Sequence, residues 1–478
     1  MKISILALLP LVAGIIGGLI GGRIHRKNKS MKRIDKNDEP NNGQTAKTTN
    51  KFLCSFAMLM FVALNLNAAN RLTAAQKACI VTRFGTEVKY NFAHSDRMTC
   101  DWDSLYMARL PHIVDTPTDE AFLDSLKLLC ATLRDGHTAV WNTKPAVRDW
   151  PLPFFTKRFG DRVFVTDVIT DKMTAAGIRP GTEILEIDDM PVIEYGEKNV
   201  IPYFPSSTPQ WSMNAAYFGG QLTNGPADKS LRVKFRNPHD SVFTLNVERD
   251  MDWQHNPYYK RVISYKRLPG NVGYIRIPSF QQGLFDHEKF IEVFDSLQNA
   301  SSMIIDIRDN GGGNSVYGDF VLRFISPDTI PALDWSSPKY IPVLKAWGAP
   351  EEPYTEKGSP LIPFSADHAD IPRFEAPVVL LVNSNTFSAS EDFAALFKSA
   401  KRGTVIGSPT GGSTGQPIMI DLGYGYMARI CARDEWLPDG TEFIGIGIIP
   451  DVTVEETPDI FSGKDVVLER ALEFLSFK

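Results

Sequence analysis

A buried strand that leads through one serine into a helix constrains this chain more than any other feature. Residues 379–382 are an apolar run of buried-strand length, and apolar residues then recur at helical spacing over 389–398. Ser388 begins this predicted helix, where unpaired backbone N–H groups and the helix dipole favour developing negative charge. The arrangement is typical of a nucleophilic serine, although the Gly-x-Ser-x-Gly sequence of a nucleophile elbow is absent. Ser388-x-x-Glu391 before an apolar run is also the pattern of a helix capping box.

A second apolar run of strand length, residues 302–307, leads into a turn of three glycines at Gly311, Gly312 and Gly313. Glycines allow the backbone to approach a ligand closely and to present N–H groups with no side chain in the way. The turn lacks the Lys-Ser/Thr pair of a phosphate-binding P-loop and the spacing of a dinucleotide-binding loop. A site that holds an oxyanion therefore suits it better than a phosphate site.

Four motifs follow one another in the C-terminal half of the chain. They are Asp306-Ile-Arg-Asp-Asn-Gly-Gly-Gly313, Ser388-Ala-Ser-Glu391, Gly407-Ser-Pro-Thr-Gly-Gly412 and Gly445-Ile-Gly-Ile-Ile-Pro-Asp451. In these motifs and their order the chain resembles the tail-specific, or C-terminal processing, serine peptidases and their tricorn-core relatives. The resemblance implies an α/β fold whose core is built of ββα units, of the crotonase or ClpP type, with Ser388 as the nucleophile. It also implies that the N–H of Ala389 and one from the glycine turn, for which we choose Gly312, hold the oxyanion.

The general base distinguishes the branches of this family. The processing peptidases place a lysine directly after the Thr-x-Gly turn, but this chain has Ser413 there. The tricorn-like branch uses a histidine instead, and its Leu-x-Asp-Gly-His element resembles Leu133-Arg-Asp-Gly-His137. Histidine suits the role because its unperturbed pKa lies near neutral pH. The resemblance therefore implies that His137 accepts the proton of Ser388.

The motifs leave open which group orients the histidine. The tricorn-like branch has a glutamate just before the Gly-x-Gly-Ile-x-Pro-Asp turn; Glu442 is the nearest candidate, but Ile444 occupies the matching position. Glu442 is therefore either catalytic or a solvated loop carboxylate. Glu391, one helical turn after Ser388, is a second candidate that would tune or anchor the site. The remaining candidates are Asp135 and the hydroxyls of Thr138 and Ser413.

A segment upstream of the core resembles a PDZ domain, a fold that binds a peptide as an added strand. The resemblance rests on residues 174–192, in which small residues and a glycine turn precede a strand and a hairpin at Asp188-Asp189. Two segments that alternate apolar and polar residues, 231–235 and 243–247, would complete the sheet. Residues 201–227 are expected to be an insertion, and no glycine-rich carboxylate loop precedes the second strand.

Periodicity and motif order divide the chain into four expected parts. Apolar residues at helical spacing after Pro117-Thr-Asp-Glu indicate a small helical domain before the PDZ-like segment. The parts are an N-terminal membrane or signal-peptide region over 1–69, the helical domain over 70–148, the PDZ-like domain over 149–252 and the serine peptidase core over 253–478.

Two apolar runs near the N-terminus bear on where the protein acts. Residues 3–20 are close to the length of a membrane-spanning helix, and residues 52–66 have the length of a signal peptide and end in Asn67-Ala-Ala. The basic segment between them would remain in the cytoplasm. We therefore expect the rest of the chain to be exported, in the periplasm or anchored to face it. A start at Met31 would leave the signal peptide alone.

Composition narrows the classes of partner. A net charge of −5 does not indicate the basic surface that nucleic-acid binding requires. Neither Cys-x-x-Cys nor His-Glu-x-x-His occurs, so the sequence predicts no metal site and no cofactor. The expected partners are protein or peptide substrates, together with a membrane if the apolar N-terminal segments are retained. No pattern predicts an oligomeric state.

The function we expect is that of an exported serine endopeptidase in which Ser388 attacks the scissile carbonyl and His137 removes its proton. Two other classes remain open. One is a non-catalytic binder of apolar ligands or peptides, as in the retinoid-binding relatives of this fold. The other is a cell-envelope hydrolase or acyltransferase with the same serine. The joint presence of Ser388, His137 and the glycine turn argues against the binder, whereas a fold alone does not determine a substrate.

Overall fold

The computed structural model describes residues 71–250, 261–326, 329–350, 352–359 and 373–476. Every element below belongs to one unit, which runs from Leu72 to the end of the chain. The apolar runs at 3–20 and 52–66, and with them the expected signal peptide or anchor, lie outside the described residues. No helix in the described part of the chain combines the length and apolarity that a membrane crossing requires.

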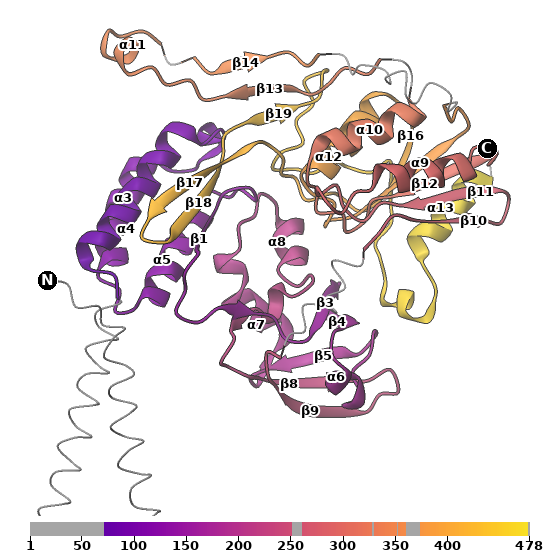
Figure 1. Ribbon diagram of the computed structural model, residues 1–478, viewed down its shortest axis with the longest axis horizontal. Helices are drawn as coiled ribbons and strands as arrows, with labels where there is room; N and C mark the ends of the chain where they lie inside the picture. The colour runs from indigo at the N-terminus through magenta and orange to yellow at the C-terminus, as the bar shows by residue number, and fades with distance from the viewer. Residues whose placement is uncertain (1–70, 251–260, 327–328, 351, 360–372, 477–478) are drawn as a thin grey trace, which may run out of the picture. The chain divides into compact units, whose positions relative to one another are not determined.

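A six-stranded sheet lies at the centre of the C-terminal half of the chain (Figure 1). Its order is β10–β11–β12–β15–β16–β20, parallel from β11 to β20 and antiparallel only between β10 and β11. Every residue of β12 and β15 is buried, as expected for parallel strands with both faces covered. The strands are β10 (Ser264–Leu268), β11 (Val272–Arg276), β12 (Ser302–Asp306), β15 (Val378–Val382), β16 (Gly403–Gly407) and β20 (Val452–Thr453).

Helices cover both faces of this sheet. Met303, Ile305 and Leu380 share a core with α9 (His287–Ser296), α10 (Ser315–Ile325) and α12 (Ala389–Ser399). The alternate residues Ile304, Val379 and Leu381 pack with α13 (Val466–Ser476) on the other face. The arrangement confirms the predicted α/β class, and it explains why β15 is an unbroken apolar run.

The N-terminal helices pack on a small antiparallel sheet that is completed by strands from far along the chain. The sheet has the order β1–β18–β17, and Tyr426 and Ile430 of β18 share a core with Phe84 and Phe122 of the helices. Residues 417–431, which the motif order assigns to the peptidase core, therefore supply the apolar surface that these amphipathic helices need. The elements are α3 (Ala74–Asn91), α4 (Trp102–Val114), α5 (Asp119–Ala131), β1 (Ala139–Asn142), β17 (Pro417–Gly423) and β18 (Tyr426–Cys431).

An antiparallel sheet follows in the order β3–β4–β5–β8–β9, with β6 paired to β5. Asp188 and Asp189 have φ of 48° and 62° in the two-residue turn between β5 and β6, as a tight hairpin requires. The two alternating segments form β8 and β9. The elements are β3 (Phe154–Phe159), β4 (Arg162–Val168), α6 (Asp171–Ala175), β5 (Glu183–Ile187), β6 (Met190–Pro191), α7 (Val192–Asn199), β8 (Leu231–Arg236) and β9 (Val242–Val247).

The expected insertion lies between α7 and β8 and contains one further helix, α8 (Pro209–Ala215). Thr208 caps this helix through its side chain, which accepts from the N–H of Trp211. The Thr208 hydroxyl also donates to the carbonyl of Gly411, 2.7 Å away, so that the insertion is bonded to the turn after β16.

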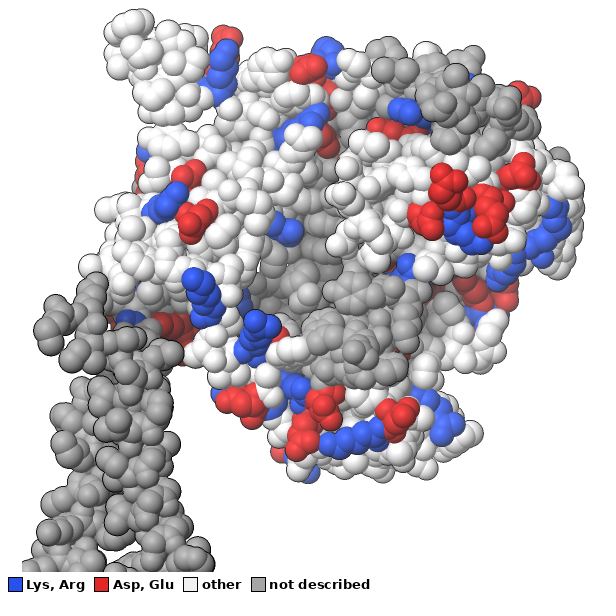
Figure 2. All heavy atoms as spheres, in the orientation of Figure 1, with Lys and Arg blue, Asp and Glu red and all other residues white. Residues whose placement is uncertain are grey.

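A third small sheet joins β13 (Asp334–Ser337), β14 (Tyr354–Glu356) and β19 (Asp434–Trp436), and α11 (Pro342–Ala346) lies at the far end of the β13–β14 arm (Figure 1). Over the face shown in Figure 2, basic and acidic side chains are interspersed rather than gathered by sign.

Candidate active site

Ser388 lies in the turn between β15 and α12 with φ of 59° and ψ of −131°. A side-chain-bearing residue in such a region costs about 1–3 kcal/mol, so the surroundings must hold it there. The N–H of Ser388 donates to the carbonyl of Ser413 at 3.0 Å, and the carbonyl of Ser388 accepts from the N–H groups of Glu391 and Asp392. Within this described turn the Ser388 side chain makes no capping hydrogen bond. The capping-box interpretation is therefore wrong for Ser388, and the hydroxyl is available for chemistry.

His137 lies directly beside this serine. Its Nε2 is 2.9 Å from Ser388 Oγ, and its Nδ1 is 2.7 Å from Ser413 Oγ. Burial lowers the pKa of His137 to about 4, against the opposing effect of the Asp135 carboxylate. The ring is therefore neutral at pH 7, with one nitrogen as donor and the other as acceptor. When Nδ1–H donates to Ser413, the lone pair of Nε2 faces the Ser388 hydroxyl, which is the arrangement that a general base needs.

Two aromatic rings stack behind the imidazole. The Phe387 ring lies 4.8 Å from that of His137 at an interplanar angle of 8°, and the Trp211 ring lies 4.0 Å from that of Phe387 at 17°. Gly136 leaves room for the stack, because a Cβ at that position would lie 2.9 Å from the Phe387 ring. Trp211 belongs to the insertion helix α8, so the insertion helps to hold the histidine. No local motif marks Trp211, and the sequence analysis did not identify it.

Glu391 is buried and holds the turn that carries Ser413. Its carboxylate accepts from the N–H of Gly412 at 2.7 Å, from the N–H of Ser413 at 2.8 Å and from the Thr410 hydroxyl. Burial raises the pKa of Glu391 to about 8, although these three donors act in the opposite direction. Glu391 therefore fixes the turn over 410–413 and reaches His137 only through Ser413.

Glu442 lies elsewhere. Its side chain is 65% exposed, and its carboxylate is 3.8 Å from the guanidinium of Arg97. No contact in the described part of the chain joins it to His137, whose Nδ1 is occupied by the Ser413 hydroxyl. The expectation of a catalytic role for Glu442 is thus corrected: of the two interpretations, the solvated loop carboxylate fits.

The remaining candidates for orienting His137 contact each other. The Thr138 hydroxyl donates to Asp135 Oδ2 at 2.6 Å, and no described hydrogen bond joins either residue to the imidazole.

The two backbone N–H groups expected to bind the oxyanion, those of Gly312 and Ala389, lie close together, but only one of them lacks a hydrogen-bond acceptor in the described part of the chain. Gly312 has φ of 89°, and a Cβ there would lie 2.7 Å from the Cβ of Ser388 and 2.9 Å from the nitrogen of Ala389. The N–H of Ala389 has no acceptor among the described residues. The N–H of Gly312, however, donates to Asn310 Oδ1 at 3.0 Å. Ala389 is thus free to bind an oxyanion in this structure, whereas Gly312 would first have to leave Asn310.

A cavity of about 490 Å³ adjoins the aromatic stack. Phe387 and Trp211 line it beside Gly136. Three further aromatic side chains and three long polar ones also line it: Trp141, Tyr203, Phe204, Lys127, Gln221 and Arg429. A space of this kind can bury an apolar side chain.

A serine hydrogen-bonded to a neutral histidine, beside a free backbone N–H at a helix start, is the arrangement that nucleophilic attack by a serine requires. Residues 271–454 match the model of Peptidase family S41. The matched region contains Ser388, Ser413 and the glycine turn, whereas His137 precedes it.

Two curated proteins illustrate what this chain is similar to. The chain is 26% identical over 264 residues to the carboxy-terminal-processing protease of Bartonella bacilliformis, which is 52% of this chain and 54% of that protein. It is 26% identical over 260 residues to the tricorn protease of Thermoplasma volcanium, or 52% of this chain and 22% of that protein. The chain thus spans about half, or less, of the length of these curated relatives. Mature CPAF complexed with lactacystin has the same fold, with a TM-score of 0.65 and 16% identity over 84% of this chain and 97% of CPAF.

Proposed function

We propose that this protein is a serine endopeptidase that cleaves peptide bonds in protein or peptide substrates. The observation that carries the proposal is the 2.9 Å contact between Ser388 Oγ and Nε2 of a neutral His137. The peptidase S41 match and the similarity to processing and tricorn proteases support the same class of reaction.

The proposed reaction follows from this geometry. Ser388 Oγ attacks the carbonyl carbon of the scissile bond while its proton passes to Nε2 of His137. The N–H of Ala389 binds the carbonyl oxygen as it becomes negative; the loss of one such donor typically lowers turnover ~10²–10³-fold. The imidazolium then protonates the leaving amine, and the C–N bond breaks to give an acyl-enzyme. Water, deprotonated by the same imidazole, hydrolyses the ester and restores Ser388.

Ser413 takes the place that a carboxylate has in many serine hydrolases. In the tautomer in which Nε2 is the base, the Ser413 hydroxyl accepts from Nδ1–H of His137. Glu391 fixes the backbone of Ser413 and completes a chain of contacts from α12 to the imidazole.

Three finer features are part of the proposal. The core is of the ββα type shared by crotonase and ClpP, which the buried parallel sheet supports. The antiparallel sheet from β3 to β9 is PDZ-like and binds a peptide along an edge strand, which its hairpin and strand positions support. The protein acts after export, which the apolar N-terminal runs support.

The test uses the purified full chain, a fluorophosphonate probe and a peptide library. We expect the wild type to be labelled and to cleave peptides, and Ser388→Ala to do neither while keeping its circular dichroism spectrum. Ser390→Ala is the matched control, because Ser390 is buried in the same turn and its hydroxyl has no described partner. Labelling without peptide cleavage would favour the envelope hydrolase, and full cleavage by folded Ser388→Ala would refute the mechanism.

A further inference from the structure

Three side chains that commonly bind metals meet behind the loop that carries His137. They are His94, Asp135 and Cys431, and one donor atom from each lies within 4.8 Å of the other two. All three are buried, with 4%, 3% and 0% of their surface exposed. The sulfur of Cys431 is 3.4 Å from Nε2 of His94. A tetrahedral zinc ion with ordinary Zn–N and Zn–S bonds would place these two atoms about 3.6 Å apart.

One oxygen of the Asp135 carboxylate has no partner. Asp135 Oδ2 accepts from the hydroxyl of Thr138, but Oδ1 is buried and makes no hydrogen bond to any described residue. A buried polar atom without a partner is destabilising, and folded proteins contain few of them. A cation between Asp135, His94 and Cys431 would satisfy this oxygen.

The second nitrogen of His94, Nδ1, is buried and makes no hydrogen bond to any described residue, and a carboxylate lies close to it. Nδ1 lies 3.5 Å from Asp434 Oδ1, which leaves Nε2 facing Cys431. Imidazole ligands usually donate their other N–H to a carboxylate or carbonyl, which fixes the tautomer and the ring orientation. Asp434 is therefore positioned to orient His94 as a ligand.

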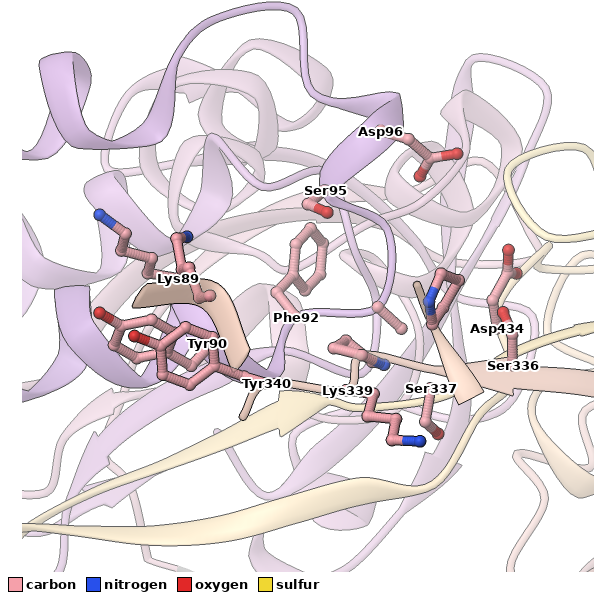
Figure 3. Close-up of a pocket in the computed structure, with 14 residues that line it drawn as sticks. Lys89, Tyr90, Phe92, Ser95, Asp96, Ser336, Ser337, Lys339, Tyr340 and Asp434 are labelled. Carbon is pink, nitrogen blue, oxygen red and sulfur yellow. The ribbon is translucent and has the colours of Figure 1, made fainter. Parts of the chain in front are cut away.

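A cavity lies beside residues that contact the cluster. Asp434 lines a cavity of about 390 Å³, together with Phe92 and Ser95, which flank His94 in the sequence (Figure 3). Phe92 and Asp434, which contact His94, thus form part of the cavity wall, and the proposed ion would enter from this side. A route of this kind is one of the requirements for a metal site.

We propose that His94, Asp135 and Cys431 bind one divalent transition-metal ion, zinc by preference, through Nε2, a carboxylate oxygen and Sγ. A nitrogen, an oxygen and a sulfur donor together suit zinc better than magnesium or calcium, which take oxygen ligands. A water molecule fills the fourth position. The thiol of Cys431 releases its proton to solvent on binding, so that one thiolate and one carboxylate balance the two positive charges of the ion.

The ion would hold the segment that carries the general base. Asp135 precedes His137 by two residues, and the hydroxyl of Thr138 accepts from the N–H of Cys431 at 3.1 Å. The metal would add a further link between this segment and β18, beside the pairing of β1 with β18. Its role is therefore to position His137 rather than to take part in the reaction, and it is separate from the proposed peptidase chemistry.

The experiment measures metal binding without reference to activity. The purified full chain is loaded with Zn²⁺ or Co²⁺ and then dialysed. Mass spectrometry measures the bound metal, and absorption spectroscopy of the cobalt-loaded protein detects the charge-transfer band of a thiolate bound to Co²⁺. We expect about one ion per chain and a cobalt band in the wild type and in Cys130→Ser, which removes a buried thiol outside the cluster. Cys431→Ser should lose the band, and Asp434→Asn should bind zinc roughly 10–100-fold more weakly.

Absence of bound metal in the loaded wild type, or a cobalt band that persists in Cys431→Ser, would overturn the proposal. If Cys431→Ser does not fold, the wild type still decides the question. Its unfolding temperature should rise with Zn²⁺ and fall with a chelator, and no change in either direction would mean that the three side chains are only a hydrogen-bonded cluster.

Discussion

Ser413 is a neutral partner for a ring that becomes charged during the proposed reaction. A carboxylate would stabilise the imidazolium more strongly, because hydrogen bonds between ionised groups are about twice as strong as neutral ones. The Ser413 hydroxyl can orient Nδ1–H, but it cannot neutralise the charge. His137 is buried and neutral, and its partner is a hydroxyl. We therefore expect Ser413 to act mainly by orienting the ring, with Nε2 as the unprotonated nitrogen.

Replacement of Ser413 tests this role. Ser413→Ala leaves Nδ1–H of His137 without its acceptor, so we expect kcat to fall about 10- to 100-fold, the equivalent of about 1–3 kcal/mol, with KM little changed. Ser413→Thr keeps a hydroxyl and should retain more activity. Glu442→Gln is the control, and its kinetics should match the wild type. A large loss in Glu442→Gln with none in Ser413→Ala would restore the glutamate to the site.

At the scale of elements, the first turn of α12 and the turn over 410–413 form one buried polar contact. Glu391 accepts three hydrogen bonds there, two of them from backbone N–H groups. Further buried carboxyls lie nearby: burial raises the pKa of Glu435 to about 8 and, with the charge of Asp392, that of Asp319 to about 6. This end of α12 therefore binds protons more tightly in the folded chain than in the unfolded one.

A dependence of stability on pH follows. The pKa of Glu391 is raised to about 8 in the folded protein from an ordinary value of 4.5, so its contribution is fully present below pH 4.5 and is lost as the pH rises through about 8. We expect the free energy of unfolding to fall across this range, by at most about 1.4 kcal/mol per pH unit for this one group.

Glu391→Gln should show a shallower fall, because it does not titrate. Denaturant unfolding of both proteins at a series of pH values measures the two slopes. The glutamine should also be less stable at every pH, since its NH₂ group would oppose one of the N–H donors. Equal slopes would show that the Glu391 carboxylate is ionised throughout.

At the scale of the whole molecule, the proposed site is assembled from three parts of the chain. The helical region provides His137, the peptidase core provides Ser388 and Ser413, and the insertion provides Trp211 through its stack on Phe387. The insertion thus bears on catalysis although it contributes no reacting group.

Trp211→Ala removes the outer ring of the stack and one wall of the adjoining cavity. We expect kcat/KM for peptide cleavage to fall about tenfold, because truncation of a stacked ring costs about 0.5–1.5 kcal/mol beyond the area it buries. Trp347→Ala is the control, because Trp347 is 77% exposed on the β13–β14 arm. Steady-state kinetics of the two variants test this prediction. Equal activity of Trp211→Ala and Trp347→Ala would mean that the insertion does not support His137.

The sequence alone determines the local elements and the residues that they carry. The apolar run into Ser388 and the glycine turn at Gly312 are readable because strand and helix periodicity and backbone freedom are local properties. The motif around His137 predicts the base for the same reason, since the resemblance rests on adjacent residues.

Tertiary packing alone decides which side chains meet. Ser413 rather than Glu442 reaches Nδ1 of His137, because Glu391 fixes the turn after β16 while Glu442 projects into solvent beside Arg97. The hairpin at 417–431 joins the N-terminal helices, since their apolar faces need a surface that the nearby chain does not provide. The proposed metal ligands His94, Asp135 and Cys431 show no motif spacing for the same physical reason. A contact between residues hundreds of positions apart depends on how whole elements pack, and no local periodicity encodes it.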